Sequence, residues 1–123
     1  MIDFTNGSIL KLKPVDPQGV DKVSDILLGD EYVKAAFAGG RDMVVFTDKR
    51  VIAVNAQGMT GKKVDYSSLP YSKVQAFSIE SAGSLDRDAE LELWFSGLGK
   101  VKFEFGGDSD ILAMARLIAE HVL

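Results

Sequence analysis

The sequence contains no cysteine, and it has a single histidine among its 123 residues. Without thiols the chain can form neither a disulfide framework nor a cysteine-based active site, which fits a reducing cytoplasm. A compact zinc site needs several cysteine or histidine ligands, and one histidine cannot supply them. We therefore expect no metal site and no cofactor.

Long apolar runs are missing as well. No segment approaches the roughly 18 to 20 apolar residues that a membrane span requires. The N-terminal segment MIDFTNGSILKLKP has an acidic residue at position 3 and no apolar stretch of signal-peptide length. These features predict a soluble, cytoplasmic protein whose contact with membranes is at most peripheral.

The chain also lacks an excess of positive charge. Its formal net charge is -4, with 46% hydrophobic and 26% charged residues. A general nucleic-acid binder depends on a positive field over the phosphates, so we expect no nucleic-acid partner. The length suits one domain, because two domains sharing it would each have too small a core.

Short β-branched and aromatic runs, separated by polar turns, predict strands. Two of them, Leu91–Phe95 and Val101–Phe105, alternate with period two, so that Leu93 and Phe103 face inward and Trp94 faces outward. Seven strands are predicted in all: Tyr32–Ala38, Met43–Phe46, Val51–Asn55, Lys62–Tyr66, Val74–Glu80, Leu91–Phe95 and Val101–Phe105.

Two helices are predicted around these strands. The first runs over Pro17–Leu28, with Asp16 as a cap and apolar residues spaced to share one face. The second runs from about Ser109 to Val122 with an apolar stripe through Met114 and Ile118. Residues 1 to 15 show no clean period, which indicates an arm or short extended piece that packs on the body or on a neighbour.

A run of four and then three antiparallel strands predicts a mainly β fold. We expect a seven-stranded pair of near-orthogonal antiparallel sheets, a partly open barrel capped by the C-terminal helix. The arm and the short helix would occupy residues 1–30, and the domain residues 31–123. The predicted core comprises Val44, Phe46, Ile52, Phe77, Leu91, Leu93, Phe103, Phe105, Ile111, Met114 and Ile118.

The stretches VVFTDKRVIAVNAQGMTGKKVDYSSLPYSKVQAFSIESAG, DRDAELELWFSG and FEFGGDSDILAMARLIAEHVL resemble the bacterial pleckstrin-homology-like domain family of small, stand-alone proteins. The resemblance covers about Glu31 to Leu123, and the segment Pro17–Leu28 also resembles the family's N-terminal extension. It implies the pleckstrin-homology fold, a tendency to self-assemble into rings through the sheets, and no established chemistry. Eukaryotic relatives that bind phosphoinositides have a long basic loop between the first two strands, whereas Gly39-Gly40-Arg41 carries one cation here.

Two basic pairs, Lys49-Arg50 and Lys62-Lys63, are the candidates for anion binding. If they met on one edge they could hold phosphate or an acidic surface. The alternative is that they are ordinary solvated turn residues. Nothing resembles a catalytic site, since His121 has no neighbouring serine or cysteine at a useful spacing, and we expect no enzyme activity.

Several apolar residues have no evident place in a core of seven strands and one helix, and they suggest an interface between copies. Trp94 breaks the polar pattern of the outward face. The N-terminal arm adds Phe4, Ile9 and Leu10. The leading hypothesis is therefore a non-enzymatic, self-assembling binding module, with an unknown protein partner as a further possibility. The alternative hypothesis is a peripheral binder of anionic phospholipid or phosphate.

Overall fold

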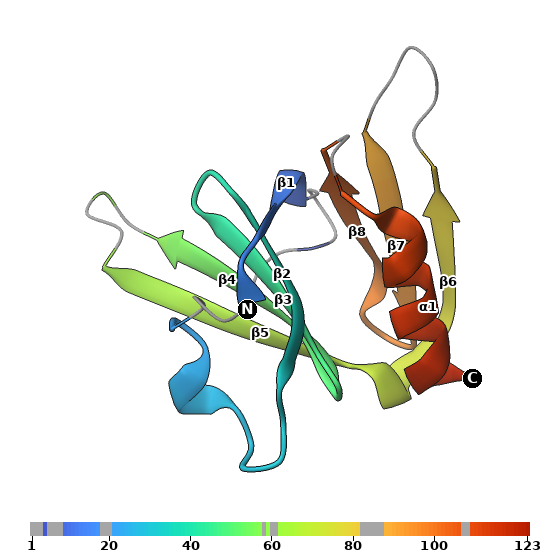
Figure 1. The fold of residues 1–123 in the computed structure, drawn as a ribbon, viewed down its shortest axis with the longest axis horizontal. Coiled ribbons are helices and arrows are strands. Elements are labelled where there is room, and N and C mark those ends of the chain that lie inside the picture. Colours follow the sequence, from blue (N-terminus) through green and yellow to red (C-terminus); the bar gives the residue numbers. More distant parts are fainter. Residues whose placement is uncertain are drawn as a thin grey trace.

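The computed structural model describes residue 4, residues 9–17, 21–57, 59, 62–81, 88–106 and 109–123. Eight strands and one α-helix lie in this part of the chain (Figure 1). The elements are β1 (Ile9–Val15), β2 (Val33–Gly39), β3 (Asp42–Thr47), β4 (Arg50–Gln57), β5 (Lys63–Pro70), β6 (Val74–Glu80), β7 (Ala89–Phe95), β8 (Gly99–Phe105) and α1 (Ile111–Val122), with short 3-10 turns η2 (Ser24–Ile26) and η3 (Tyr71–Lys73).

The eight strands form one open sheet in the order β5-β4-β3-β2-β1-β8-β7-β6. Strands β2 to β5 make one antiparallel meander and β6 to β8 another, and the two groups run in different directions in Figure 1. Strand β1 joins them, because it pairs antiparallel with β2 and parallel with β8. Strands β5 and β6 are consecutive in the chain, through η3, yet they form the two ends of the sheet.

The mainly β class with a C-terminal helix is confirmed, and two details of it are corrected. The seven predicted strands are present as β2 to β8, but β1 is an eighth strand, and it unites the expected pair of sheets into one. Pro14, which lacks an N–H group, lies in β1, and the pairing of β1 with β8 is irregular between Ile9 and Leu12. A proline in a central strand argues against a strand when only the sequence is considered.

The predicted helix over Pro17–Leu28 is not seen. Residues 18–20 lie outside the described part of the chain, and residues 21–28 form turns around η2. Val23 is fully buried, and the backbone becomes extended at Leu27. Burial of these side chains against the sheet overrides the local helical pattern, as tertiary contacts often do.

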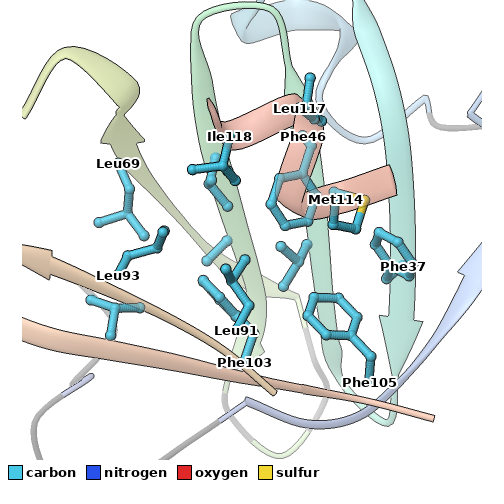
Figure 2. Packing of buried hydrophobic residues seen from close by; sticks show 14 of the residues in the cluster. Phe37, Phe46, Leu69, Leu91, Leu93, Phe103, Phe105, Met114, Leu117 and Ile118 are labelled. Atoms are coloured by element: carbon cyan, nitrogen blue, oxygen red, sulfur yellow. The ribbon is translucent and has the colours of Figure 1, made fainter. Parts of the chain in front are cut away.

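The main core lies between the two groups of strands and under α1. Phe37 and Phe105 meet edge to face with ring centroids 4.8 Å apart, and Phe46 stands 5.8 Å from Phe37. Figure 2 shows Met114 and Ile118 reaching from the helix towards the side chains of the strands. The predicted core residues are buried there, apart from Phe77, which is only partly buried, and Ile52, which belongs to another cluster.

A second, smaller core lies on the opposite face of the β2 to β5 meander. Val23, with Ile26 and Leu27 beside it, covers this face. The buried members from the strands are Ala36, Val45, Ile52 and Val54. Because β4 is buried on both faces, its sequence reads as the continuous apolar run VIAV rather than as an alternation. We call residues 21–31 the strap, because this segment covers the second face of the meander.

The α-helix begins slightly later than the sequence indicates. Asp110 is the N-cap, and its Oδ1 accepts a hydrogen bond of 3.1 Å from the backbone N–H of Ala113. This satisfies a backbone donor that the helix itself leaves unpaired. The cap fixes the start of α1 directly after β8 and so places the helix against β6, β7 and η3.

Candidate binding site

The basic pair Lys49-Arg50 lies in the turn between β3 and β4, where Arg50 is held inside the chain. Its guanidinium donates to both carboxylate oxygens of Glu31, from Nε at 2.9 Å and from Nη2 at 2.8 Å. It also donates to the carbonyl of Ile26 at 2.7 Å and to Ser68 Oγ at 2.8 Å. These bonds tie the strap to β4 and β5. Lys49 is exposed and lies 3.5 Å from Asp30.

Glu31 is a buried acid whose charge is maintained by its neighbours. Burial alone would raise the pKa of this carboxyl, but hydrogen bonds from Arg50, the Thr47 hydroxyl and the Leu28 N–H outweigh that effect. The pKa is lowered from 4.5 to about 2. The Glu31–Arg50 pair is thus a clasp between the strap and the sheet.

The second basic pair, Lys62-Lys63, lies at the other end of the β4–β5 hairpin. Arg50 pairs with Pro70 at one end and Gln57 pairs with Lys63 at the other, so the two basic pairs are about 24 Å apart along the strands. The structure does not bring the four residues together. Anion binding by either pair stays a prediction.

The structure brings a different cation to Lys62 and Lys63. Arg41 sits in the turn between β2 and β3, next to Gly40, whose φ of 59° is one that glycine adopts without strain. Its Nη2 donates to the carbonyl of Met59, at 3.5 Å, in the β4–β5 hairpin. We call Arg41, Lys62 and Lys63 the loop-end cations. In a meander, alternate turns share one end of the sheet, and that simple rule could have identified this grouping from the sequence.

Acidic residues lie close behind the loop-end cations. Asp42 and Asp65 are both cross-strand partners of Asn55, whose Nδ2 donates to Asp42 Oδ1 at 2.5 Å. Among the side chains that the structure describes here, three cations face two carboxylates. This end of the sheet has a modest positive excess in a chain that is acidic overall.

Trp94 lies on the outward face of β7, and the predicted alternation of this hairpin is confirmed. Its cross-strand partners are Ala76 on β6 and Lys100 on β8. The side chain is half-buried. The remainder of this face is polar, with ion pairs between Lys100 and Glu92 at 3.6 Å and between Lys102 and Glu90 at 3.1 Å. An interface role for Trp94 stays a prediction.

The N-terminal residues expected at the interface have a different environment. Phe4 is only 5% exposed and packs edge-on against Phe103, with ring centroids 6.4 Å apart. Leu12 is fully buried. These two side chains have a place in the core of their own chain, which corrects the expectation that the arm lacked one. Ile9 and Leu10 belong to β1, and their side chains lie outside the described part of the structure.

The two end strands of the sheet differ in how well their edges are protected. Strand β5 carries Lys63 at one end and Pro70 at the other. Strand β6, VQAFSIE, has no proline and a single charged residue, Glu80 at its end. Proteins usually protect exposed edges with lysine, proline or bulges. Strand β6 has one irregularity, between Val74 and Ala76, but from Ala76 onwards its outer edge carries neither lysine nor proline, and it is the less protected of the two.

The side chains of His121 and Tyr71 contact the main chain and each other. His121 Nδ1 lies 2.8 Å from the carbonyl of Leu117, and its ring is 5.0 Å from that of Tyr71. The Tyr71 hydroxyl donates to the carbonyl of Thr47 at 2.8 Å, and burial raises the pKa of this phenol.

Among residues whose placement is described, no three histidine or carboxylate side chains gather as ligands of a metal would. The same residues include no helix with the length and apolarity to cross a bilayer.

The family model for the bacterial PH domain matches residues 3–122. The chain belongs to the bacterial PH domain family. It is 45% identical over 101 residues to the uncharacterized protein YjqA of Bacillus subtilis strain 168, a match that covers 80% of this chain and 81% of YjqA.

Two solved structures from Shewanella are similar to this PH chain. A DUF1696 family protein with a pleckstrin-homology domain from Shewanella loihica PV-4 is 36% identical, with a TM-score of 0.81, and the match covers 95% of this chain and 100% of that one. A pleckstrin homology domain from Shewanella amazonensis SB2B is 38% identical, with a TM-score of 0.69 and coverage of 96% and 93%. The similarity extends over nearly the whole length of each chain.

Proposed function

We propose that this PH protein is a cytoplasmic, non-enzymatic binding module that associates with itself through the ends of its open sheet. The observation that supports this proposal is the strand order, in which β5 and β6 are end strands although they are consecutive in the chain. Among the described residues, each end strand has one row of main-chain groups without a strand partner. Such a row is a template for pairing with another chain.

The less protected edge, β6, is the preferred contact. Its outward side chains at Ala76 and Ser78 are small and exposed, and neither would repel an incoming strand. Ala76 is also the cross-strand neighbour of Trp94, so a strand added to β6 would lie about 10 Å from the tryptophan, two strand spacings away. The added subunit can then bury the exposed half of the Trp94 side chain. Aromatic residues contribute most to the binding energy when an interface buries them completely.

Pairing of β5 from one copy with β6 of the next is the arrangement that we favour. It uses both edges of every subunit, and it closes into a ring if the rotation between neighbours allows closure. A closed ring leaves no edge exposed, which removes the hazard of open-ended growth.

Light scattering of the wild type and of an edge variant tests this proposal. The variant Ala76→Lys with Ser78→Lys adds two charges to the edge of β6, and we expect it to run as a monomer of 13.3 kDa while the wild type runs at a multiple of that mass. Ser96→Lys, in the exposed turn between β7 and β8, is the matched control and should behave as the wild type does. A wild type that stays at the monomer mass at high concentration contradicts the proposal.

A second candidate function is peripheral binding of an anionic phospholipid or of phosphate at the loop-end cations. The specific observation is the contact from Arg41 Nη2 to Met59 O, which holds two turns side by side. Three cations on adjacent turns can approach one anionic headgroup, each contributing a charge-assisted hydrogen bond.

Sedimentation with vesicles tests the second candidate. With phosphatidylserine vesicles at low ionic strength we expect binding that weakens as salt is added, because the attraction is electrostatic. Lys62→Glu with Lys63→Glu should abolish it, whereas Lys73→Glu, an exposed cation in η3, should not. Inorganic phosphate as competitor separates headgroup recognition from attraction to a charged surface. This candidate function is rejected if vesicle binding changes neither with salt concentration nor in either variant.

A further inference from the structure

A groove of about 550 Å³ lies between strand β2 and helix α1, and its lining includes no residue of the end strands β5 and β6 and none of the loop-end cations. Leu112 on its wall is 68% exposed and Ala35 is partly buried, and these two give it accessible apolar surface. Met114 and Leu117 also line it, but they are buried in the main core, with only 4% and 8% of their surface exposed. Four charged side chains also line it: Lys34, Asp110, Arg116 and Glu120. Its volume is within the range of natural ligand sites.

The backbone of β2 beside this groove lacks one of its two strand partners. Strand β1 pairs with β2 from Lys13 opposite Ala38 to Val15 opposite Ala36, and its pairing ends there. Val33 and Ala35 are paired on their other side with β3, with a register shift between them at Lys34. Within the described chain, no strand lies on the β1 side of these three residues. Two of these residues, Lys34 and Ala35, line the groove. An extended segment could therefore continue the line of β1 and make main-chain hydrogen bonds to β2.

Three of the four charges in the groove are already engaged. Lys34 lies 3.9 Å from Glu120, and its ammonium is 5.7 Å from the Tyr32 ring centroid. Asp110 caps the helix. Arg116 is exposed and has no ion pair or hydrogen bond in the described part of the structure. An unpaired guanidinium beside an apolar floor is complementary to a carboxylate attached to apolar groups.

We propose that this groove binds an extended peptide segment of a partner protein, in which apolar residues alternate with an acidic one. The peptide backbone adds to the Val33–Ala35 edge of β2. Its apolar side chains, on one side of the strand, contact Leu112 and Ala35, and its carboxylate pairs with Arg116. This function goes beyond self-association and uses a different surface, so the two can be tested separately.

Selection from a random heptapeptide phage library identifies ligands and tests the site. The wild type serves as bait, and the variant Ala113→Trp serves for counter-selection, because Ala113 is exposed on α1 and an indole there fills the groove. We expect the enriched peptides to combine alternating apolar residues with Asp or Glu and to lose binding to Ala113→Trp. A circular dichroism spectrum identical to that of the wild type shows that the blocked variant is folded. No enrichment, or equal enrichment on the blocked variant, overturns the proposal.

A charge exchange tests the role of Arg116. For a selected peptide made synthetically, fluorescence anisotropy should show at least tenfold weaker binding to Arg116→Glu, and replacing the acidic residue of the peptide with lysine should restore it. Lys62→Glu, an exposed cation at the loop end, is the matched control and should bind as the wild type does. A peptide that binds Arg116→Glu and wild type equally overturns the assigned pairing.

Strand addition requires hydrogen bonds between the peptide main chain and β2, whereas a contact between apolar side chains does not. Methylation of the peptide nitrogens that point to β2 should weaken binding at least tenfold, while methylation of the alternate nitrogens should have little effect. The Ala76→Lys and Ser78→Lys variant should retain the peptide affinity of the wild type. If the two methylated peptides bind with the same affinity, strand addition is excluded. That result would not affect the proposal of self-association.

Discussion

Arg50 and Glu31, which are 19 residues apart in the sequence, form a two-bonded ion pair of 2.9 and 2.8 Å that closes the strap onto the sheet. The Glu31 side chain is fully buried, and that of Arg50 is 19% exposed. A buried pair adds little compared with apolar residues of the same shape, but removing one partner leaves the other charge uncompensated. The clasp therefore makes the strap sensitive to single substitutions.

The first prediction concerns this clasp. Glu31→Ala should lower the free energy of unfolding by about 3 to 5 kcal/mol, because it leaves the Arg50 guanidinium without its acid. Asp30→Ala removes the exposed partner of Lys49 and should have little effect. Urea unfolding followed by tryptophan fluorescence measures both. If the two variants lose the same stability, Glu31 is not a buried anchor.

The second prediction is the pH dependence that follows from the lowered pKa of Glu31. Its pKa falls from 4.5 in the unfolded chain to about 2 in the folded one, so the folded state favours the ionised form. The resulting stability is fully present above pH 4.5 and is lost as the pH falls towards 2, with an amplitude on the order of 3 kcal/mol. Glu31→Gln should flatten the curve of unfolding free energy over this pH range. A Gln variant that follows the wild-type slope would rule out this assignment.

The third prediction tests the inward and outward faces of the β7–β8 hairpin. Leu93 and Phe103 are fully buried, so Leu93→Ala and Phe103→Ala should each cost about 2 to 5 kcal/mol of stability. Glu92→Ala, on the outer face, removes one ion pair and should cost far less. Thermal unfolding by calorimetry compares the three variants. Similar losses in all three contradict the observed alternation.

The strands were predictable wherever each one shows its own pattern. The β7–β8 hairpin alternates cleanly, and β4 is a short β-branched run, so local reasoning identified both. Strand β1 depends on its two partners, since Pro14 and the shift between Ile9 and Leu12 remove the local signal. The strap shows the opposite problem. Its apolar residues are spaced as in a helix, but burial of Val23 against the sheet determines the backbone conformation of the strap.

The candidate sites show the same division between local and distant information. Lys49 and Arg50 are adjacent in sequence, yet the partner that occupies Arg50 comes from the strap, and nothing near position 50 indicates it. Lys62 and Lys63 are adjacent in the sequence, but the place of Arg41 at the same end of the sheet follows only from the order of the turns. The groove could not be predicted at all, because its two walls, β2 and α1, are far apart in the sequence and only the fold brings them together.

The last prediction separates the strap from the rest of the fold. Val23 is fully buried in the second core, and Val23→Ala removes two carbon atoms there, which should cost about 1.6 kcal/mol at about 0.8 kcal/mol per buried carbon. Because the main core does not include Val23, the loss should appear first as local opening of the strap. Hydrogen exchange should then accelerate at the amides of Ser24 and Ile26, whose backbone bonds lie within the strap, while the amides of β7 and β8 keep their rates. Lys22→Ala, at the exposed neighbouring position, is the control and should change neither set. Equal acceleration of the strap and of β7 and β8 would mean that the strap unfolds only together with the whole domain, and that the second core is not an independent layer.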